Sequence, residues 1–462
     1  MPNKPVESLP NEFLEQLETV LDTQGIQEFC DSLKKPTPTS IRLNPHKKIS
    51  HSADMTPVPW CPTAYYLPER PSFTLDPSFH AGAYYVQEAS STFLHHILVT
   101  LKIQPSSMML DLCAAPGGKS TLLSSYLGDS GLLVANEVIK NRVQVLKENV
   151  IKWGLGNTIV TQNDPSHFSD LEGIFDLVLV DAPCSGEGMF RKDPAAISEW
   201  SPENVSLCAA RQQRIIDQVG ALPKSGGYLI YATCTYNRSE NEENIAFITQ
   251  EFSYESVRIP IDKEWGIQES EINIEDDTYY GYRFFPHQVT GEGFFISVLR
   301  RTGQSDQSIS LAKEFRHTHL KRVSPRDIPT ELSSQLDHTK AIRLYQLGES
   351  YFAIPESLQP TFEKLADCLN IRYFGVELGQ VIRGEWLPSH EWALSVLEKK
   401  NIPRLELPRD EALQFLRKDS VSADDSPKGW LLVTYLDLPL GWVKNLGNRV
   451  NNYYPKAWRI RA

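Results

Sequence analysis

Short apolar runs alternate with helical segments between residues 106 and 301. Such alternation is typical of a parallel β-sheet flanked by helices. Five of the runs are almost continuously apolar, so we expect strands that are buried on both faces. A sixth alternates less clearly and is expected to be an antiparallel strand near the sheet edge. The expected strands are 107–112, 131–137, 157–164, 175–183, 226–234 and, as the sixth, 291–299.

The segments on either side of this sheet predict further modules. Residues 9–34 place apolar side chains at helical spacing, and residues 38–50 are typical of a strand followed by a basic turn. The polar stretch TGQSDQSIS at 302–310 indicates where the central domain ends. We therefore expect four parts: a leading module at 1–100, a central α/β domain at 101–302, an intermediate α+β domain at 311–400 and a compact, mostly β module at 401–462.

Composition narrows the class of protein. No stretch approaches eighteen consecutive apolar residues, and the first residues carry no apolar signal segment, so we expect a cytoplasmic protein without membrane contact. The seven cysteines form no CxxC pair and have no histidine at zinc spacing, so we expect neither a disulfide framework nor a metal site. The net charge of -12 argues against a nucleic-acid binder, yet residues 301–462 hold 23 Lys and Arg against 20 Asp and Glu.

A glycine-containing loop follows the first expected strand and opens a helix. In this loop, DLCAAPGGKS at 111–120, Gly117 and Gly118 let a ligand approach the free amides of the helix N-terminus. That environment suits the carboxylate of S-adenosylmethionine (AdoMet). The loop lacks both the GxGxxG pattern and the spacing of a phosphate loop, which disfavours a nucleoside triphosphate.

Two acidic residues end the next two strands. Glu137 stands about twenty residues after Gly117, where an acid in a doubly wound fold accepts hydrogen bonds from ribose hydroxyls. Asp164 ends the third strand, where an acid can meet the adenine amino group. Each could instead be a helix cap or an exposed turn residue, but their occurrence on successive strand ends favours the cofactor site.

Two cysteines end the fourth and fifth strands. Cys184 lies in DAPCSGEGMF at 181–190, and Cys234 lies in YATCTYNRSENEENI at 231–245. These strands are expected to be neighbours, about 4.8 Å apart, with ligands bound beyond their carboxyl ends. Each cysteine alone could be a buried bystander; their convergence at the cofactor edge favours one shared site.

Two thiols beside AdoMet suit methylation of cytosine at C5. That carbon becomes nucleophilic after a thiolate adds to C6, and a second group must then help to remove the C5 proton. The residues alone leave open which cysteine does which, and which group deprotonates the nucleophile. Asp181 is placed to hydrogen-bond N3 and the exocyclic amine of the base, or else is a turn cap; Lys119 could stabilise developing charge, or else cap the sheet edge.

The three motifs together resemble the RNA (cytosine-C5)-methyltransferases of the Sun/Nop group. The resemblance extends to IRLN at 41–44, YYVQEASS at 84–91, RFFPHQVTGEGFF at 283–295 and the C-terminal PLGWVKNLGNRVNNYYPKAWRI. It implies a Rossmann-like class I methyltransferase sheet, an N-terminal RNA-recognition module and a PUA-like RNA-binding C-terminal domain. It further implies AdoMet as cofactor and, as substrate, cytidine near the decoding site of small-subunit (16S) ribosomal RNA; we expect a monomer.

The resemblance also assigns site residues. It implies that Cys234 is the nucleophile and that Cys184 assists product release. The implied AdoMet contacts are Cys113, Ala114, Ala115, Pro116, Gly117, Gly118, Lys119, Glu137, Asp164 and Asp181.

Two basic segments are candidates for RNA contact. The stretch 442–462 contains five cations, no acid and four aromatic residues, which suits phosphate binding and base stacking, although aromatics in small β modules also form cores. They are Lys444, Arg449, Lys456, Arg459 and Arg461, with Trp442, Tyr453, Tyr454 and Trp458. A second candidate patch, for which simple surface solvation is the alternative, consists of Arg42, His46, Lys47 and Lys48.

Three other functions are compatible with parts of the pattern. A methyltransferase acting on amino groups would replace the DAPC strand end with an Asn/Asp-Pro-Pro-aromatic sequence. A non-catalytic RNA-binding assembly factor would not need the intact loop and both cysteines. A dinucleotide oxidoreductase is the third and most distant alternative.

Overall fold

The computed structural model describes residues 9–48, 54–303, 315, 317, 319–337 and 341–461 of the chain. Most of the stretch 302–310, where we expected the central domain to end, lies outside the described residues. The four-part division of the chain therefore stays a prediction.

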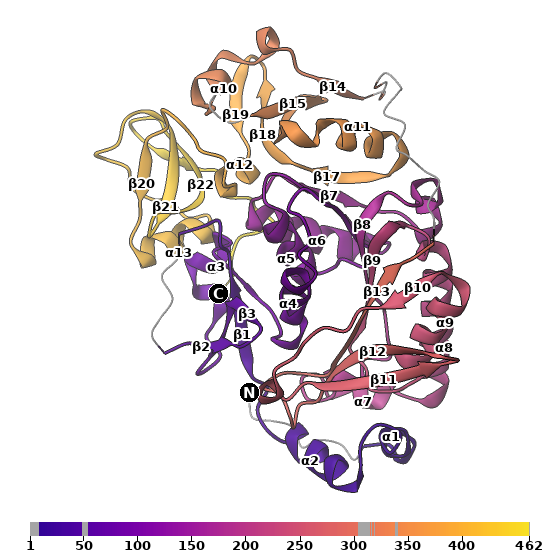
Figure 1. Cartoon of the computed structure of the whole chain (residues 1–462). Helices are drawn as coiled ribbons and strands as arrows, with labels where there is room; N and C mark the ends of the chain where they lie inside the picture. The colour runs from indigo at the N-terminus through magenta and orange to yellow at the C-terminus, as the bar shows by residue number, and fades with distance from the viewer. Residues whose placement is uncertain are drawn as a thin grey trace.

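The expected parallel sheet forms the centre of the molecule (Figure 1). Its parallel strands lie in the order β9, β8, β5, β6 and β7, so the direction of winding reverses between β5 and β8. Ligands of such sheets bind beyond the carboxyl ends of the strands at this reversal point. The strands are β5 (Met108–Asp111), β6 (Leu132–Asn136), β7 (Thr158–Thr161), β8 (Phe175–Asp181) and β9 (Pro223–Thr233).

The sixth strand is antiparallel as expected, but it does not lie at the edge. β13 (Phe294–Arg301) pairs with β9, and β12 (Asp277–Phe284) and β11 (Gln268–Ile274) continue the sheet beyond it. At the opposite edge β17 (Ile371–Phe374) adds an antiparallel strand to β7. The intermediate region of the chain thus contributes a strand to the central sheet.

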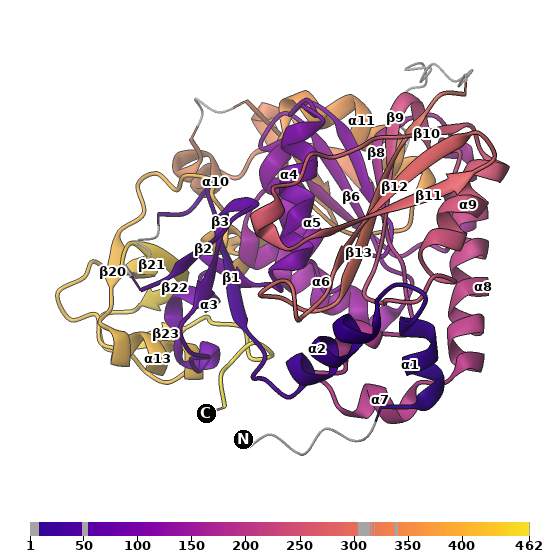
Figure 2. The same ribbon diagram turned by 60° about the horizontal axis from the view of Figure 1, so that its bottom comes forward.

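Helices cover both faces of the central sheet. One face packs against α4 (Phe93–Thr100), α5 (Gly118–Leu127) and α6 (Lys140–Trp153), and the other against α8 (Pro202–Val219) and α9 (Glu242–Glu251) (Figure 2). Neighbouring side chains of one strand therefore enter different cores: Met109 belongs to the first and Leu110 to the second. Burial on both faces explains the continuous apolar runs of the sequence.

Smaller modules surround the sheet. Near the N-terminus, α1 (Asn11–Leu17) and α2 (Thr23–Leu33) precede an antiparallel sheet of β2 (Thr56–Val58), β3 (Cys61–Leu67), β1 (Thr39–Leu43) and β4 (Tyr84–Val86), with α3 (Pro77–His80) beside it. Within the catalytic part are also α7 (Ala195–Glu199) and β10 (Tyr254–Ser256). Among the described residues, no helix has the length and apolar character needed to cross a membrane.

The C-terminal region forms two further sheets. The first contains β14 (Leu320–Arg322), β15 (Ile342–Leu347), β16 (Ser350–Pro355), β18 (Val376–Ile382) and β19 (Glu385–Pro388), with α10 (Thr330–Gln335), α11 (Gln359–Cys368) and α12 (His390–Leu394) nearby. The second contains β20 (Arg404–Glu406), β21 (Gly429–Tyr435), β22 (Leu438–Asn445) and β23 (Val450–Asn452), with α13 (Arg409–Arg417).

Two members of the N-terminal basic patch direct their cationic groups into the protein. Arg42 is 1% exposed; its guanidinium donates hydrogen bonds to Gln87 Oε1 at 2.8 Å and to Thr121 Oγ1 at 2.6 Å, which ties β1 to α5. The Lys47 ammonium donates to the carbonyl oxygens of Ala81 and Lys152. The hypothesis of a single RNA-binding patch is therefore wrong for these two residues, because their charges serve packing between segments.

The C-terminal basic stretch, 442–462, also contains both buried and exposed side chains. Trp442 and Tyr454 are each 1% exposed and belong to the core, where the Trp442 indole donates to the carbonyl oxygen of Ser389. Tyr453 is 37% exposed. The side chains of the candidate stretch that remain exposed and cationic are those of Arg449, Lys456, Arg459 and Arg461. Most of the aromatic residues therefore belong to the core of the β module, which was the alternative to base stacking. The cations stay on the surface.

Candidate active site

A cavity of about 1100 Å³ lies at the carboxyl ends of β5, β6 and β8. It brings together almost all of the residues that the sequence analysis selected: Cys113, Ala114, Ala115, Pro116, Gly118, Lys119, Glu137, Asp164, Asp181, Cys184 and Cys234. Gly117 is the one selected residue that does not line it. Sequence positions up to 121 apart therefore converge on one space.

The loop after β5 turns directly into α5. Gly117 occupies the cap position with φ of +113°, a left-handed conformation that disfavours side chains, so its function is to make the turn. Beneath the loop, Ser120 donates a hydrogen bond to the buried Asp111. Burial raises the pKa of the Asp111 carboxyl to about 7.

Glu137 and Asp164 take different positions at the cavity wall. Glu137 is buried: its Oε1 accepts from the backbone amide of Ile139, and Arg142 lies 3.2 Å from Oε2. Among the described residues, none donates a hydrogen bond to that second oxygen. Asp164 lines the cavity and also caps a short 3-10 helix by accepting from the amide and hydroxyl of Ser166, which lower the pKa of its carboxyl. The cap is thus observed, and the contact of Asp164 with the adenine amino group stays a prediction.

Asp181 and Lys119 form an ion pair in the cavity wall. The Lys119 ammonium lies 2.8 Å from Asp181 Oδ2 and 5.0 Å from the centre of the Phe294 ring. Burial disfavours the ammonium charge, but the attraction of Asp181 outweighs it and raises the pKa of Lys119. Lys119 therefore stays positively charged beside Asp181. This position fits a role in stabilising charge better than a role as a cap of the sheet edge.

The two cysteine sulfurs lie 3.1 Å apart. The backbone amide of Cys234 also points to Cys184 Sγ at 3.4 Å. The register of β8 and β9, which pairs Asp181 with Ala232, explains the contact, because Cys184 stands three residues after Asp181 and Cys234 two residues after Ala232. The hydrogen bond with Cys234 and burial raise the pKa of Cys184 well above that of an ordinary thiol. The contact with Cys234 therefore favours the protonated form of the Cys184 thiol.

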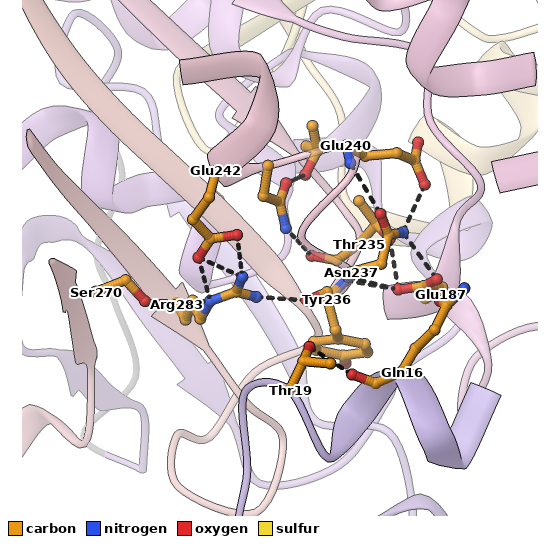
Figure 3. Close-up of polar contacts among 12 residues, drawn as sticks. Gln16, Thr19, Glu187, Thr235, Tyr236, Asn237, Glu240, Glu242, Ser270 and Arg283 are labelled. Carbon is orange, nitrogen blue, oxygen red and sulfur yellow. Dashed lines mark hydrogen bonds and ion pairs between the residues drawn. The ribbon is translucent and has the colours of Figure 1, made fainter. Parts of the chain in front are cut away.

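Glu187 connects the two cysteine-bearing loops (Figure 3). It belongs to the Cys184 loop, is 1% exposed, and its Oε2 accepts from Thr235 Oγ1 at 2.5 Å and from the amides of Tyr236 and Asn237 at 2.7 and 3.0 Å. Its Oε1 accepts from Asn237 Nδ2 and from the Trp200 indole. One carboxylate of the first loop therefore fixes the backbone of the second, directly after Cys234.

Glu240 makes the reverse connection. It belongs to the Cys234 loop, and its side chain accepts from the backbone amide of Ser185 at 2.9 Å, next to Cys184. Asn237 and Gln212 also donate to it, while burial raises the pKa of the Glu240 carboxyl. We name Glu187 and Glu240 the reciprocal clamp: each loop places a buried carboxylate on the backbone amides of the other, which sets the separation of the two sulfurs.

The N-terminal helices support this clamp from outside. Phe13 of α1 and Phe29 of α2 pack with Tyr236, Phe190 and Trp200, and α1 and α2 lie beside α7 in Figure 2. The sequence analysis selected none of these residues. Both clamp acids stand inside motifs that it quoted, but the motif alone gives no sign that they are buried.

Two observations of this structure show that the cavity fits AdoMet. The first is the free amide end of α5, reached over glycines. The second is Glu137 Oε2, a buried acceptor that receives no hydrogen bond from the described residues and can take one from a ribose hydroxyl. For metals, no cluster of three or more candidate ligands occurs in the part of the chain that the structure describes.

Three family profiles match successive parts of the chain. They are the N-terminal domain of 16S rRNA methyltransferase RsmF at residues 9–89, 16S rRNA methyltransferase RsmB/F at 98–300 and the methyltransferase RsmF PUA domain at 402–460. Relatives called ribosomal RNA small subunit methyltransferase F match nearly end to end. That of Erwinia tasmaniensis is 30% identical and that of Escherichia coli O157:H7 29% identical, each over 97% of this chain and 96% of the relative.

Solved structures share the fold. A methyltransferase homolog protein from Pyrococcus horikoshii is 26% identical, with a TM-score of 0.51 over 63% of this chain and 100% of its own. NSun6 from Pyrococcus horikoshii, solved with SFG, is 21% identical, with a TM-score of 0.53 over 65% of this chain and 100% of its own. Sequence, sheet order and cavity thus agree, and the chain belongs to the RsmB/F family of 16S rRNA methyltransferases.

Proposed function

We propose that this protein transfers a methyl group from AdoMet to C5 of a cytosine in 16S ribosomal RNA, near the decoding site. The observation that carries the proposal is the pair of sulfurs 3.1 Å apart in a cavity that fits AdoMet. An amino-group methyltransferase needs no thiol pair. The family membership supports RNA as the substrate.

Cys234 is the nucleophile in this proposal. Its sulfur bonds to C6 of the cytosine, the C5–C6 π electrons move into the ring, and N3 takes up a proton, which makes C5 nucleophilic. Bound AdoMet supplies the electrophilic methyl group. Afterwards C5 carries both a methyl group and a hydrogen, so a base must remove that proton as the bond from Cys234 breaks.

Cys184 is the base that removes the C5 proton. Contact with the Cys234 sulfur is the main cause of its raised pKa. Once the Cys234 sulfur is bonded to carbon, its thiol no longer forms the hydrogen bond that is the main cause of the raised pKa of Cys184. Cys184 can then release its own proton to water and accept the one from C5.

The Lys119–Asp181 pair binds the polar edge of the cytosine, which carries N3 and the exocyclic amine. The carboxylate of Asp181 can accept a hydrogen bond from the exocyclic amine of cytosine, and the pair can deliver a proton to N3 and recover it after elimination. Held cationic by Asp181, Lys119 stabilises negative charge that moves into the ring. AdoMet is held by the α5 amides, Glu137 and Asp164.

The surrounding modules are proposed to hold flanking RNA. The exposed cations of 449–461 and the N-terminal module are the candidate surfaces. A cytosine stacked in RNA must be turned out of its stack, at a cost of a few kcal/mol, to reach the cavity. We propose a cytoplasmic enzyme that works as a monomer.

The test uses labelled AdoMet with naked 16S RNA and with the assembled small subunit. The modified base is identified after nuclease digestion. Label in 5-methylcytosine is expected from the wild-type protein, and none from Cys234→Ala, which should still bind AdoMet. Label in an amino-methylated base, or full activity of Cys234→Ala, would contradict the proposal.

A further inference from the structure

One face of α8 carries a stripe of exposed side chains outside the residues already assigned. Leu207, Arg211, Arg214 and Gln218 follow one another at intervals of four, three and four residues, so they share one helix face. The opposite face packs into the core through Val205, Cys208, Gln212, Ile216 and Val219. α8 forms the outer side of the catalytic part in Figure 2. We call these four residues the α8 stripe.

The stripe begins on the surface and reaches the catalytic cavity. Arg211, Arg214 and Gln218 line the same cavity as the two cysteines, although all three are exposed. Leu207 is 66% exposed and stands at the end of the stripe that lies outside the cavity. A ligand lying along the stripe would therefore be continuous with a ligand in the cavity.

The cations of the stripe are not held in ion pairs. Within the described chain, the guanidinium groups of Arg211 and Arg214 form neither a hydrogen bond nor an ion pair, and Arg214 is near enough to Asp164 to help lower the pKa of that carboxyl. Two other cations of the same cavity lie in ion pairs: Lys119 pairs with Asp181, and Arg142 with Glu137. Two exposed guanidinium groups that line a cavity outside any ion pair, in a chain of net charge -12, indicate an anionic ligand there.

The chemistry of the stripe fits a polynucleotide backbone. A guanidinium presents a rigid fork of donors that matches a phosphate, and it binds every phosphate regardless of sequence. An exposed leucine beside such a fork offers an apolar surface to an unstacked base. Once one cytosine occupies the cavity, the phosphates of the adjoining nucleotides must lie at its entrance, where the arginines are.

We propose that the α8 stripe binds the single-stranded RNA segment that flanks the target cytosine. Arg211 and Arg214 bind its phosphates and Leu207 contacts a neighbouring base. The proposal rests on the proposed function and adds to it a path for the substrate over the catalytic domain itself. The acidic central part thus has its own RNA contact, apart from the N-terminal and C-terminal modules.

The test compares the double variant Arg211→Gln/Arg214→Gln with the wild-type protein. RNA binding is measured by fluorescence anisotropy over a range of salt concentrations. Loss of two phosphate contacts should weaken binding about 10- to 100-fold at low salt and reduce the slope of log K against log salt by about 1.4. AdoMet affinity, measured by calorimetry, should stay within about twofold. Leu207→Ser should weaken RNA binding without changing the slope.

A matched control is Arg326→Gln. Arg326 is also exposed and has no side-chain partner among the described residues, but it does not line the cavity. It should leave both RNA affinity and the slope unchanged. An unchanged slope in the double variant, or a loss of AdoMet affinity in place of RNA affinity, would overturn the proposal. Absence of methyl transfer to cytosine C5 by the wild-type protein would contradict the proposed function instead, since RNA binding tests the stripe directly.

Discussion

Replacing Glu187 by Gln tests whether the reciprocal clamp sets the positions of the two sulfurs. The amide has nearly the shape of the carboxylate but keeps only one acceptor oxygen. The five groups around Glu187 all donate hydrogen bonds to it: three donate to Oε2 and two to Oε1. In either orientation the new NH₂ group faces donors, so at least two hydrogen bonds are lost.

The size of the effect follows from these bonds. A hydrogen bond to a charged group contributes about 1.5–3 kcal/mol, and rotation of Thr235 or Asn237 recovers part of the loss. We expect Glu187→Gln to lower the free energy of unfolding by about 2–4 kcal/mol. If the Cys234 loop moves by about 1 Å, the rate of methyl transfer should fall about 100-fold. None of the freed groups lines the cavity, so the Kd of AdoMet should not change.

The assay separates stability from positioning. Urea unfolding gives the stability, and single-turnover methyl transfer at a temperature where the variant is folded gives the rate. Glu363→Gln is the matched control, because Glu363 is a buried carboxylate that accepts from Arg322, Tyr345 and Gln359 away from the cavity. It should lose stability and keep its rate. A folded Glu187→Gln protein with the wild-type rate would refute the reasoning.

Three further predictions concern the cavity and the buried cation. Glu137→Gln should raise the Kd of AdoMet about tenfold, measured by calorimetry, because a charged acceptor is lost; an unchanged Kd would remove Glu137 from the cofactor site. Asp111 has a pKa raised from 3.8 to about 7, so the folded state keeps a proton that the unfolded chain has lost. Wild-type stability should therefore fall relative to Asp111→Asn as pH rises from about 4 to about 7 in urea titrations, and parallel pH curves would contradict this. Arg42→Met should cost about 3 kcal/mol of stability by breaking the link between β1 and α5, while RNA affinity of the folded protein stays unchanged; a specific loss of RNA affinity would restore Arg42 to the surface patch.

The sequence was most informative where backbone topology decides geometry. Cys184 and Cys234 each follow a buried parallel strand, and neighbouring strands deliver their ends to one edge, so their contact could be expected before the structure was known. The same logic placed Glu137 and Asp164 at the cavity. The roles of these residues remain proposals, because proximity alone does not assign chemistry.

The features that sequence did not show depend on burial and on long-range pairing. Arg42 was taken for a surface charge, although its neighbours Ile41 and Leu43 are apolar and the whole of β1 is buried. In the sequence, Glu187 has the features of an ordinary acidic residue in a turn. Its burial results from the contact with the Cys234 loop, which only the structure shows. β17 pairs with β7 although more than 200 residues separate the two strands in the sequence. A local sequence pattern cannot predict such a pairing.

The most direct test of the account is the covalent bond itself. Cys184→Ala, incubated with RNA and AdoMet, should accumulate protein linked to methylated RNA, because the nucleophile attacks but the C5 proton cannot leave. Mass spectrometry after digestion should place the nucleotide on Cys234. Normal turnover by Cys184→Ala without any adduct, or an adduct on another residue, would contradict the two-thiol mechanism.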